Sequence, residues 1–163
     1  MNNYFPYSRQ LINKDDIDEV IKVLKSDYLT QGPNLQKLEL NFQKKVKSKY
    51  CLAVSSATAG LHLSCLSLDL NKGDFLWTVP NSFVASANCG LYCGAKVSFV
   101  DIDEFTFNID INLLEKKLVF AKKQNKIPKA IVVVHMAGSP ADIFKVKKLA
   151  KKYNFKIIED ASH

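Results

Sequence analysis

Cysteine, histidine and arginine are scarce in this chain of 163 residues, which contains four, three and one of them. The four cysteines form no C-x-x-C pair and the histidines are scattered, so neither a disulfide framework nor a zinc site is indicated. Cys89 and Cys93 are four residues apart and would share one helix face, which is far short of a metal ligand set. We therefore expect buried free thiols and no bound metal.

Long apolar runs are also missing. No stretch of about 18 apolar residues is present that could span a bilayer. The first ten residues lack the basic-then-apolar order of a secretory signal. The sequence therefore predicts a cytoplasmic protein that does not insert into membranes. With 47% apolar and 24% charged residues, the chain has the composition of one globular domain.

The chain is basic, with a net charge of +7, but its positive charge is almost entirely lysine. Arg9 is the only arginine, whereas base recognition in nucleic acids relies on the guanidinium fork. The lysines occur as pairs on what we expect to be solvent faces of several helices. This pattern favours a solvated surface over the alternatives of nucleic-acid or small-anion binding, and we expect no nucleic-acid partner.

The N-terminal part shows the helical period. Apolar residues recur at i, i+3, i+4 and i+7 over residues 17–24, behind Asn13 as a candidate cap. A second helix is predicted over residues 35–46, with Pro33 at or near its first turn. A loop that contains Thr30 and Gln31 separates the two helices.

From residue 50 onward, strand and helix patterns alternate. Short apolar runs predict strands over residues 50–55, 75–79, 97–101, 130–135 and 156–159. Segments of helix length lie between them, over residues 58–68, 83–93, 111–123 and 143–153, the last with Asp142 as its cap. This alternation predicts an α/β fold in which helices cover both faces of a mostly parallel sheet.

The chain ends directly after the last predicted strand, where a further helix is expected to cover the sheet. We therefore expect a piece of a longer protein, with an N-terminal arm over residues 1–48 and a truncated sheet domain over residues 49–163.

Familiar phosphate and nucleophile signatures are absent. No G-x-G-x-x-G, G-x-x-x-x-G-K-[ST] or G-x-S-x-G follows a predicted strand. The first predicted strand leads instead into SSATAG, residues 55–60. Free amides at the start of a helix favour a phosphate there, whereas Ser56 or Thr58 serving only as a helix cap is the alternative.

Two further strand ends carry unusual residues. In TVPNSFVASAN, residues 78–88, Phe83 stands near the start of a helix, where it either covers a flat ligand or belongs to the core. In IIEDASH, residues 157–163, two carboxylates end a buried strand and need a partner such as a cation or a protonated ring nitrogen. A metal ligand, a ribose contact and a helix cap are the alternatives for these carboxylates.

Together these strings resemble the sugar aminotransferases of the DegT/DnrJ/EryC1/StrS family, which use pyridoxal phosphate (PLP) and have the aspartate-aminotransferase fold, PLP-transferase fold type I. The resemblance extends from PYSRQLINKDDIDEVIKVLKSDYLTQGP through SSATAGLHLSC, TVPNSFVASANCGLYCGAKVSFVDID and VVVHMAGSPADI to KIIEDASH. The opening and the NSFVASAN string are most similar to the transaminases that act on UDP-4-keto-6-deoxy-N-acetylhexosamines in pseudaminic acid biosynthesis.

The resemblance implies roles for five residues around the cofactor. Ala57 and Thr58 would hold the PLP phosphate, Phe83 would stack on the pyridine ring, and Asp160 would pair with the protonated ring nitrogen. His163 would lie beside the ring near its phenolic oxygen.

The resemblance also implies that the N-terminal arm carries a substrate loop. Three of its residues would reach the sugar-nucleotide pocket: Tyr7, Gln31 and Gly32.

The family's Schiff-base lysine lies beyond the EDASH motif, so the resemblance implies that neither this catalytic lysine nor the C-terminal small domain is in the chain. We expect the piece alone to be inactive. The full-length relative would transfer an amino group, with glutamate as the expected donor, to C4 of a UDP-linked keto sugar for cell-surface sugars, as a homodimer. The alternatives are a PLP-dependent sugar 3-dehydratase of the same family and a non-catalytic partner module.

Overall fold

The computed structural model describes residues 9–162, which divide along the chain into two compact units, the first ending at Ala53 and the second beginning at Val54. The first unit contains helices α1 (Lys14–Leu24) and α2 (Pro33–Val46). Asn13 caps α1 in a capping box, because its side chain accepts from the Asp15 and Asp16 amides while the Asp16 carboxylate accepts from the Asn13 amide. Both predicted helices are confirmed, and Pro33 is the first residue of α2.

No residue of α1 or α2 is buried, although both helices carry apolar residues at helical spacing. Val20, Leu24, Leu38 and Phe42 are each more than half exposed. The first unit thus presents an apolar surface that the described residues of this unit do not cover.

The second unit is built on a four-stranded parallel sheet of order β2-β1-β3-β4. Its strands are β1 (Phe75–Thr78), β2 (Lys96–Phe99), β3 (Ala130–Val134) and β4 (Lys156–Asp160). Every residue of β3 is buried, as expected of a central strand covered on both faces. All four strands follow the predicted ranges closely.

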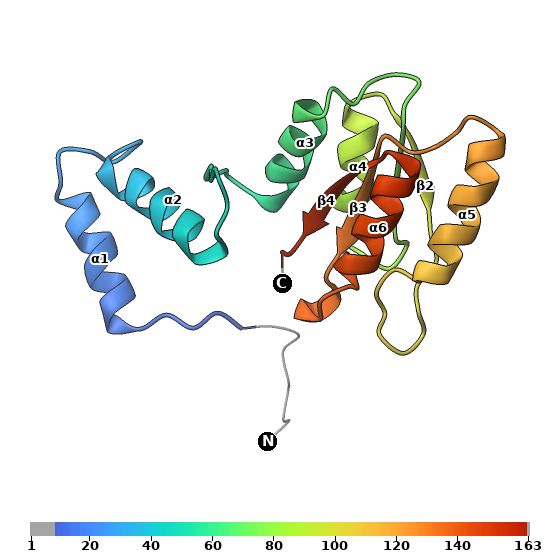
Figure 1. Ribbon diagram of the computed structural model, residues 1–163. Helices are drawn as coiled ribbons and strands as arrows, with labels where there is room; N and C mark the ends of the chain where they lie inside the picture. Colours follow the sequence, from blue (N-terminus) through green and yellow to red (C-terminus); the bar gives the residue numbers. More distant parts are fainter. Residues whose placement is uncertain (1–8, 163) are drawn as a thin grey trace. The chain divides into compact units, whose positions relative to one another are not determined.

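Helices flank this sheet on both faces (Figure 1). They are α3 (Ala57–Ser67), α4 (Ala85–Tyr92), α5 (Ile111–Lys123) and α6 (Ile143–Tyr153), with a short 3-10 turn at Met136–Gly138. Gly90 of α4 lies so close to Leu76 that an added Cβ would be 3.0 Å from the Leu76 Cβ. The next residue, Trp77, points to the other face, where the Lys117 amine of α5 lies 4.6 Å from its ring centre. The predicted α/β fold with covered faces is confirmed.

The predicted strand over residues 50–55 is wrong. These residues form no ladder with any of the four strands, and Tyr50 and Leu52 are 78% and 73% exposed. A strand requires hydrogen bonds from a neighbour, and in the described chain no strand lies beside this segment. An apolar run alone therefore did not suffice to form one.

None of the helices in residues 9–162 combines the length and the apolar character that crossing a membrane requires.

Candidate active site at the carboxyl edge of the sheet

Asp160 is the last residue of β4, and its side chain is only 8% exposed. Its Oδ2 accepts a hydrogen bond from the Ser86 hydroxyl at 2.7 Å. Its Oδ1 accepts from the Ser162 hydroxyl at 2.6 Å and from the Ser162 amide at 3.3 Å. No lysine, arginine or histidine among residues 9–162 forms an ion pair with it. A buried carboxylate without a counter-ion is suited to a cationic ligand group.

Phe83 lies in the turn between β1 and α4, at the same edge of the sheet. Its side chain is 74% exposed, so the interpretation of Phe83 as a core residue is wrong. The turn is anchored at Asn81, whose side-chain amide donates to the Phe107 carbonyl at 3.0 Å. An exposed aromatic ring on an anchored turn is available to cover a flat ligand.

Helix α3 leads into the amino end of β1, so the start of α3 lies toward the carboxyl edge of the sheet, where Asp160 and Phe83 also lie. Ser56 caps this helix, and its hydroxyl accepts from the Ala59 amide at 3.1 Å. The amides of Ala57 and Thr58 donate no hydrogen bond to another described residue. Ser56 is thus the cap, and the two amides expected to hold a phosphate remain available for an anion.

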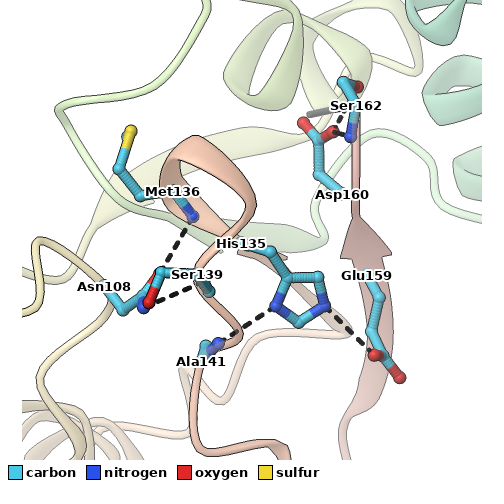
Figure 2. A network of polar contacts seen from close by, with 8 residues as sticks. All are labelled: Asn108, His135, Met136, Ser139, Ala141, Glu159, Asp160 and Ser162. Carbon is cyan, nitrogen blue, oxygen red and sulfur yellow. Dashed lines mark hydrogen bonds and ion pairs between the residues drawn. The ribbon is translucent and has the colours of Figure 1, made fainter.

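His135 follows β3 and ties its end to β4 (Figure 2). The His135 amide donates to the Asp160 carbonyl at 3.0 Å. The Nδ1 atom of the His135 ring accepts a hydrogen bond from the Ala141 amide at 3.1 Å, so in the neutral ring the proton is on Nε2. Nε2 then donates to Glu159 Oε2 at 3.3 Å. Glu159 therefore faces His135, while the neighbouring Asp160 faces α4.

The loop after β3 is held from its other side by the buried Asn108 (Figure 2). The Asn108 Oδ1 accepts from the Met136 amide at 3.0 Å, and its Nδ2 donates to the Ser139 carbonyl at 3.2 Å. Both polar atoms of the Asn108 side chain are thus used, and they hold the two ends of this turn.

The chain is similar to known proteins. A model of the DegT/DnrJ/EryC1/StrS aminotransferase family matches residues 10–163. The chain belongs to this family. It is 36% identical to the spore coat polysaccharide biosynthesis protein SpsC of Bacillus subtilis, over 99% of this chain and 40% of SpsC.

Solved aminotransferases have the same fold. Helicobacter pylori PseC, an aminotransferase involved in the biosynthesis of pseudoaminic acid, is 34% identical with a TM-score of 0.88, over 98% of this chain and 42% of PseC. The putative sugar aminotransferase Spr1654 of Streptococcus pneumoniae, in its PMP-form, is 26% identical with a TM-score of 0.86, over 98% of this chain and 42% of Spr1654. The chain therefore spans about two fifths of the length of these relatives.

Four of the predicted site residues lie in the second unit: Ala57, Thr58, Phe83 and Asp160. Gln31 and Gly32 belong to the first unit, where they line a cavity of about 610 Å³ between α1 and α2. Gln31 has a left-handed φ of 51°, and a Cβ on Gly32 would lie 2.7 Å from the Tyr28 Cβ. Tyr7 and His163 lie outside the described residues.

Ser86 and His135 were not predicted from the sequence as site residues. Ser82 lies before the first residue of α4, so helical spacing did not indicate the 3.0 Å contact between the Ser82 and Ser86 hydroxyls. His135 follows a continuous apolar strand, a position that places it at the carboxyl edge of the sheet. A serine at the start of a helix or a histidine after a strand does not by itself indicate a site residue. Only the contacts of Ser86 and His135 with β4 do so.

The cysteines are all free, and Cys65 and Cys89 are buried between α3 and α4 as predicted, whereas Cys51 and Cys93 are half-buried. The hydrogen bond to Cys89, together with burial, raises the pKa of the Cys65 thiol. Cys89 lies near the site, and its thiol donates to the Ser86 carbonyl at 3.4 Å. Cys65 is therefore a packing residue and not a nucleophile.

Proposed function

We propose that this chain is the cofactor-binding part of a PLP-dependent aminotransferase that acts on a nucleotide-linked keto sugar. The observation that carries the proposal is the buried Asp160 carboxylate, which has hydrogen bonds to serines but no counter-ion in residues 9–162. A protonated pyridine nitrogen supplies the missing charge at that position.

The residues present fit PLP. Asp160 would accept the ring N–H, Phe83 would cover the ring, and the amides of Ala57 and Thr58 would hold the phosphate. PLP, when bound, supplies an electron sink for the electrons left when the substrate carbon loses a proton. Asp160 keeps the ring nitrogen protonated, and Phe83 shields one side of the site from water. His163 beside the phenolic oxygen completes the proposed set.

The proposed substrate is a UDP-linked 4-keto-6-deoxy-N-acetylhexosamine, with glutamate as amino donor. The support is the likeness to PseC and SpsC, whose names place them in pseudoaminic acid and spore coat polysaccharide biosynthesis. Tyr7, Gln31 and Gly32 in the arm over residues 1–48 would contact the sugar nucleotide. Residues 49–163 would form the truncated PLP-binding domain. A cytoplasmic homodimer acting in cell-surface sugar biosynthesis is part of the same proposal.

Binding of pyridoxamine 5′-phosphate (PMP) tests the cofactor site, because PMP carries the same ring and phosphate and needs no covalent bond. Isothermal titration is expected to show PMP binding to the chain, and strongly reduced binding to Asp160→Asn. Glu104→Gln, which changes an exposed carboxylate, is the matched control and should bind as the unmodified chain does. Equal affinity of Asp160→Asn and the unmodified chain would refute the proposal.

Product analysis with the full-length protein separates the two reaction classes of the family, since we expect this chain alone to be inactive. An amino sugar formed from the UDP-linked keto sugar and glutamate supports the aminotransferase, whereas loss of the C3 hydroxyl supports the dehydratase.

A further inference from the structure

Ser86 is the one residue of α4 whose hydroxyl contacts the Asp160 carboxylate. It is the second residue of the helix, in its first turn, is 1% exposed, and its Oγ is 2.7 Å from Asp160 Oδ2. A serine in the interior of a helix can donate to a carbonyl of the preceding turn, as the half-buried Ser64 does to Gly60 in α3. No turn of α4 precedes Ser86, and its hydroxyl donates across the interface between α4 and β4.

The direction of the hydrogen bonds around Ser86 follows from counting protons. An ionised carboxylate only accepts, so the Ser86 hydroxyl must donate to Asp160. Its oxygen is then left to accept from Ser82, whose Oγ lies 3.0 Å away. The three groups form a relay in which Ser82 donates to Ser86 and Ser86 donates to Asp160, and each bond polarises the next. The relay begins at the residue before Phe83.

The two serines around Asp160 bind different oxygens. Ser86 holds Oδ2, whereas Ser162 holds Oδ1 through its hydroxyl and its amide. A carboxylate has about four lone-pair positions, and three donors occupy them here. The plane of the carboxylate is therefore fixed, and about one position remains for a further N–H donor.

We propose that Ser86 is a positioning residue for Asp160, which orients the carboxylate and keeps it ionised so that the proton stays on the cofactor ring nitrogen. The inference rests on the proposed function, since it assumes that Asp160 meets a pyridine nitrogen. Without the Ser86 hydroxyl, Oδ2 would be buried with no donor from α4. A buried carboxylate that has lost a donor favours its neutral form, so the proton would move from the ring to Asp160.

The test uses PMP labelled with ¹⁵N at the ring nitrogen, bound to the full chain. The ¹⁵N chemical shift reports whether this nitrogen is protonated, and titration gives the affinity. Ser86→Ala is expected to move the resonance toward the neutral ring and to raise the PMP Kd by about ten- to a hundredfold, the equivalent of one hydrogen bond to a charged group. Ser86→Thr keeps a hydroxyl and should restore the shift of the unmodified chain.

Ser64→Ala is the matched control, because it removes a helix serine hydroxyl that lies outside the site. It should leave the shift and the affinity unchanged. If circular dichroism shows that Ser86→Ala does not fold, Ser82→Ala removes the preceding donor of the relay and should move the shift in the same direction by less.

The outcomes separate the two claims. No PMP binding by the unmodified chain, or undiminished binding by Asp160→Asn, overturns the proposed function and this inference with it. Binding that depends on Asp160 but is indifferent to Ser86→Ala, or to Ser82→Ala where that variant is used, overturns the role of Ser86 alone.

Discussion

Asp160→Asn is expected to change the stability of the chain in opposite directions with and without the cofactor analogue. In the free chain the carboxylate is buried and has no counter-ion among residues 9–162, so its charge opposes folding. An effective desolvation penalty of several kcal/mol per buried ion is removed by the neutral amide. The hydrogen bonds from Ser86 and Ser162 lose their charge assistance, about 1 kcal/mol each. The free variant should therefore be more stable by about 1 kcal/mol.

With PMP the order reverses. At a PMP concentration of 100 times its Kd, binding stabilises the unmodified chain by about 2.7 kcal/mol, which corresponds to a Tm increase of about 5–10 °C at this chain length. Removal of the charged partner weakens binding by at least about 2 kcal/mol, or roughly thirtyfold. The same PMP concentration then stabilises Asp160→Asn by less than about 1 kcal/mol.

Differential scanning fluorimetry measures the Tm of the unmodified chain and of Asp160→Asn, each with and without PMP. Asp160→Asn should start with the higher Tm and gain the smaller increase. Two results would refute the reasoning: a free variant of markedly lower Tm, which would show that Asp160 is a structural residue, or an equal PMP increase in both chains.

Three further predictions concern the sheet and the turn beside the site. Thr78→Val should raise the free energy of unfolding by about 1 kcal/mol, because the buried Thr78 Oγ1 has no hydrogen-bond partner within residues 9–162; urea denaturation measures it, and a loss of stability would contradict it. Lys129→Met should cost about 0.5–1 kcal/mol at pH 7, since Lys129 Nζ lies 2.9 Å from Asp74 Oδ2. Burial raises the pKa of Asp74, but hydrogen bonds from Lys129 and the Asn71 amide outweigh it and hold that pKa below its ordinary value of 3.8, so the cost should disappear as the pH falls through that lowered value in a pH series of denaturation curves. Phe83→Ala should change stability by less than about 0.5 kcal/mol but raise the PMP Kd by about three- to tenfold, and titration that shows unchanged affinity would exclude stacking.

The regular parts of the fold were predictable because local chemistry and the apolar pattern agree there. In α6, Asp142 accepts from the Lys145 amide at 3.1 Å and the buried face is the one that the spacing indicates, so both bounds were correct. The same holds for α5, which Asp110 caps by accepting from the Asn112 and Leu113 amides. Strand β3 was evident from its unbroken apolar run.

Where the sequence analysis failed, the deciding contact comes from a distant part of the chain. Ser86 donates to a residue 74 positions away, and the Lys117 amine donates to Ser98 at 2.7 Å from another element. No local pattern carries such pairs. Residues 50–55 failed for the converse reason, since an apolar run forms a strand only where a neighbouring strand supplies its hydrogen bonds.

Two residues of the proposed site have a burial that contradicts their chemistry. Asp160 is charged and buried, Phe83 is aromatic and 74% exposed, and both lie at the carboxyl edge of a parallel sheet. Selection for stability alone would favour an exposed Asp160 and a buried Phe83. Burial of the Asp160 carboxylate costs desolvation free energy, and exposure of the Phe83 ring leaves apolar area in water. A flat cationic ligand removes both costs at once, since it neutralises the carboxylate and covers the ring. The pyridinium ring of the family's cofactor has both properties, so in the proposed site one ligand would account for the burial of Asp160 and the exposure of Phe83.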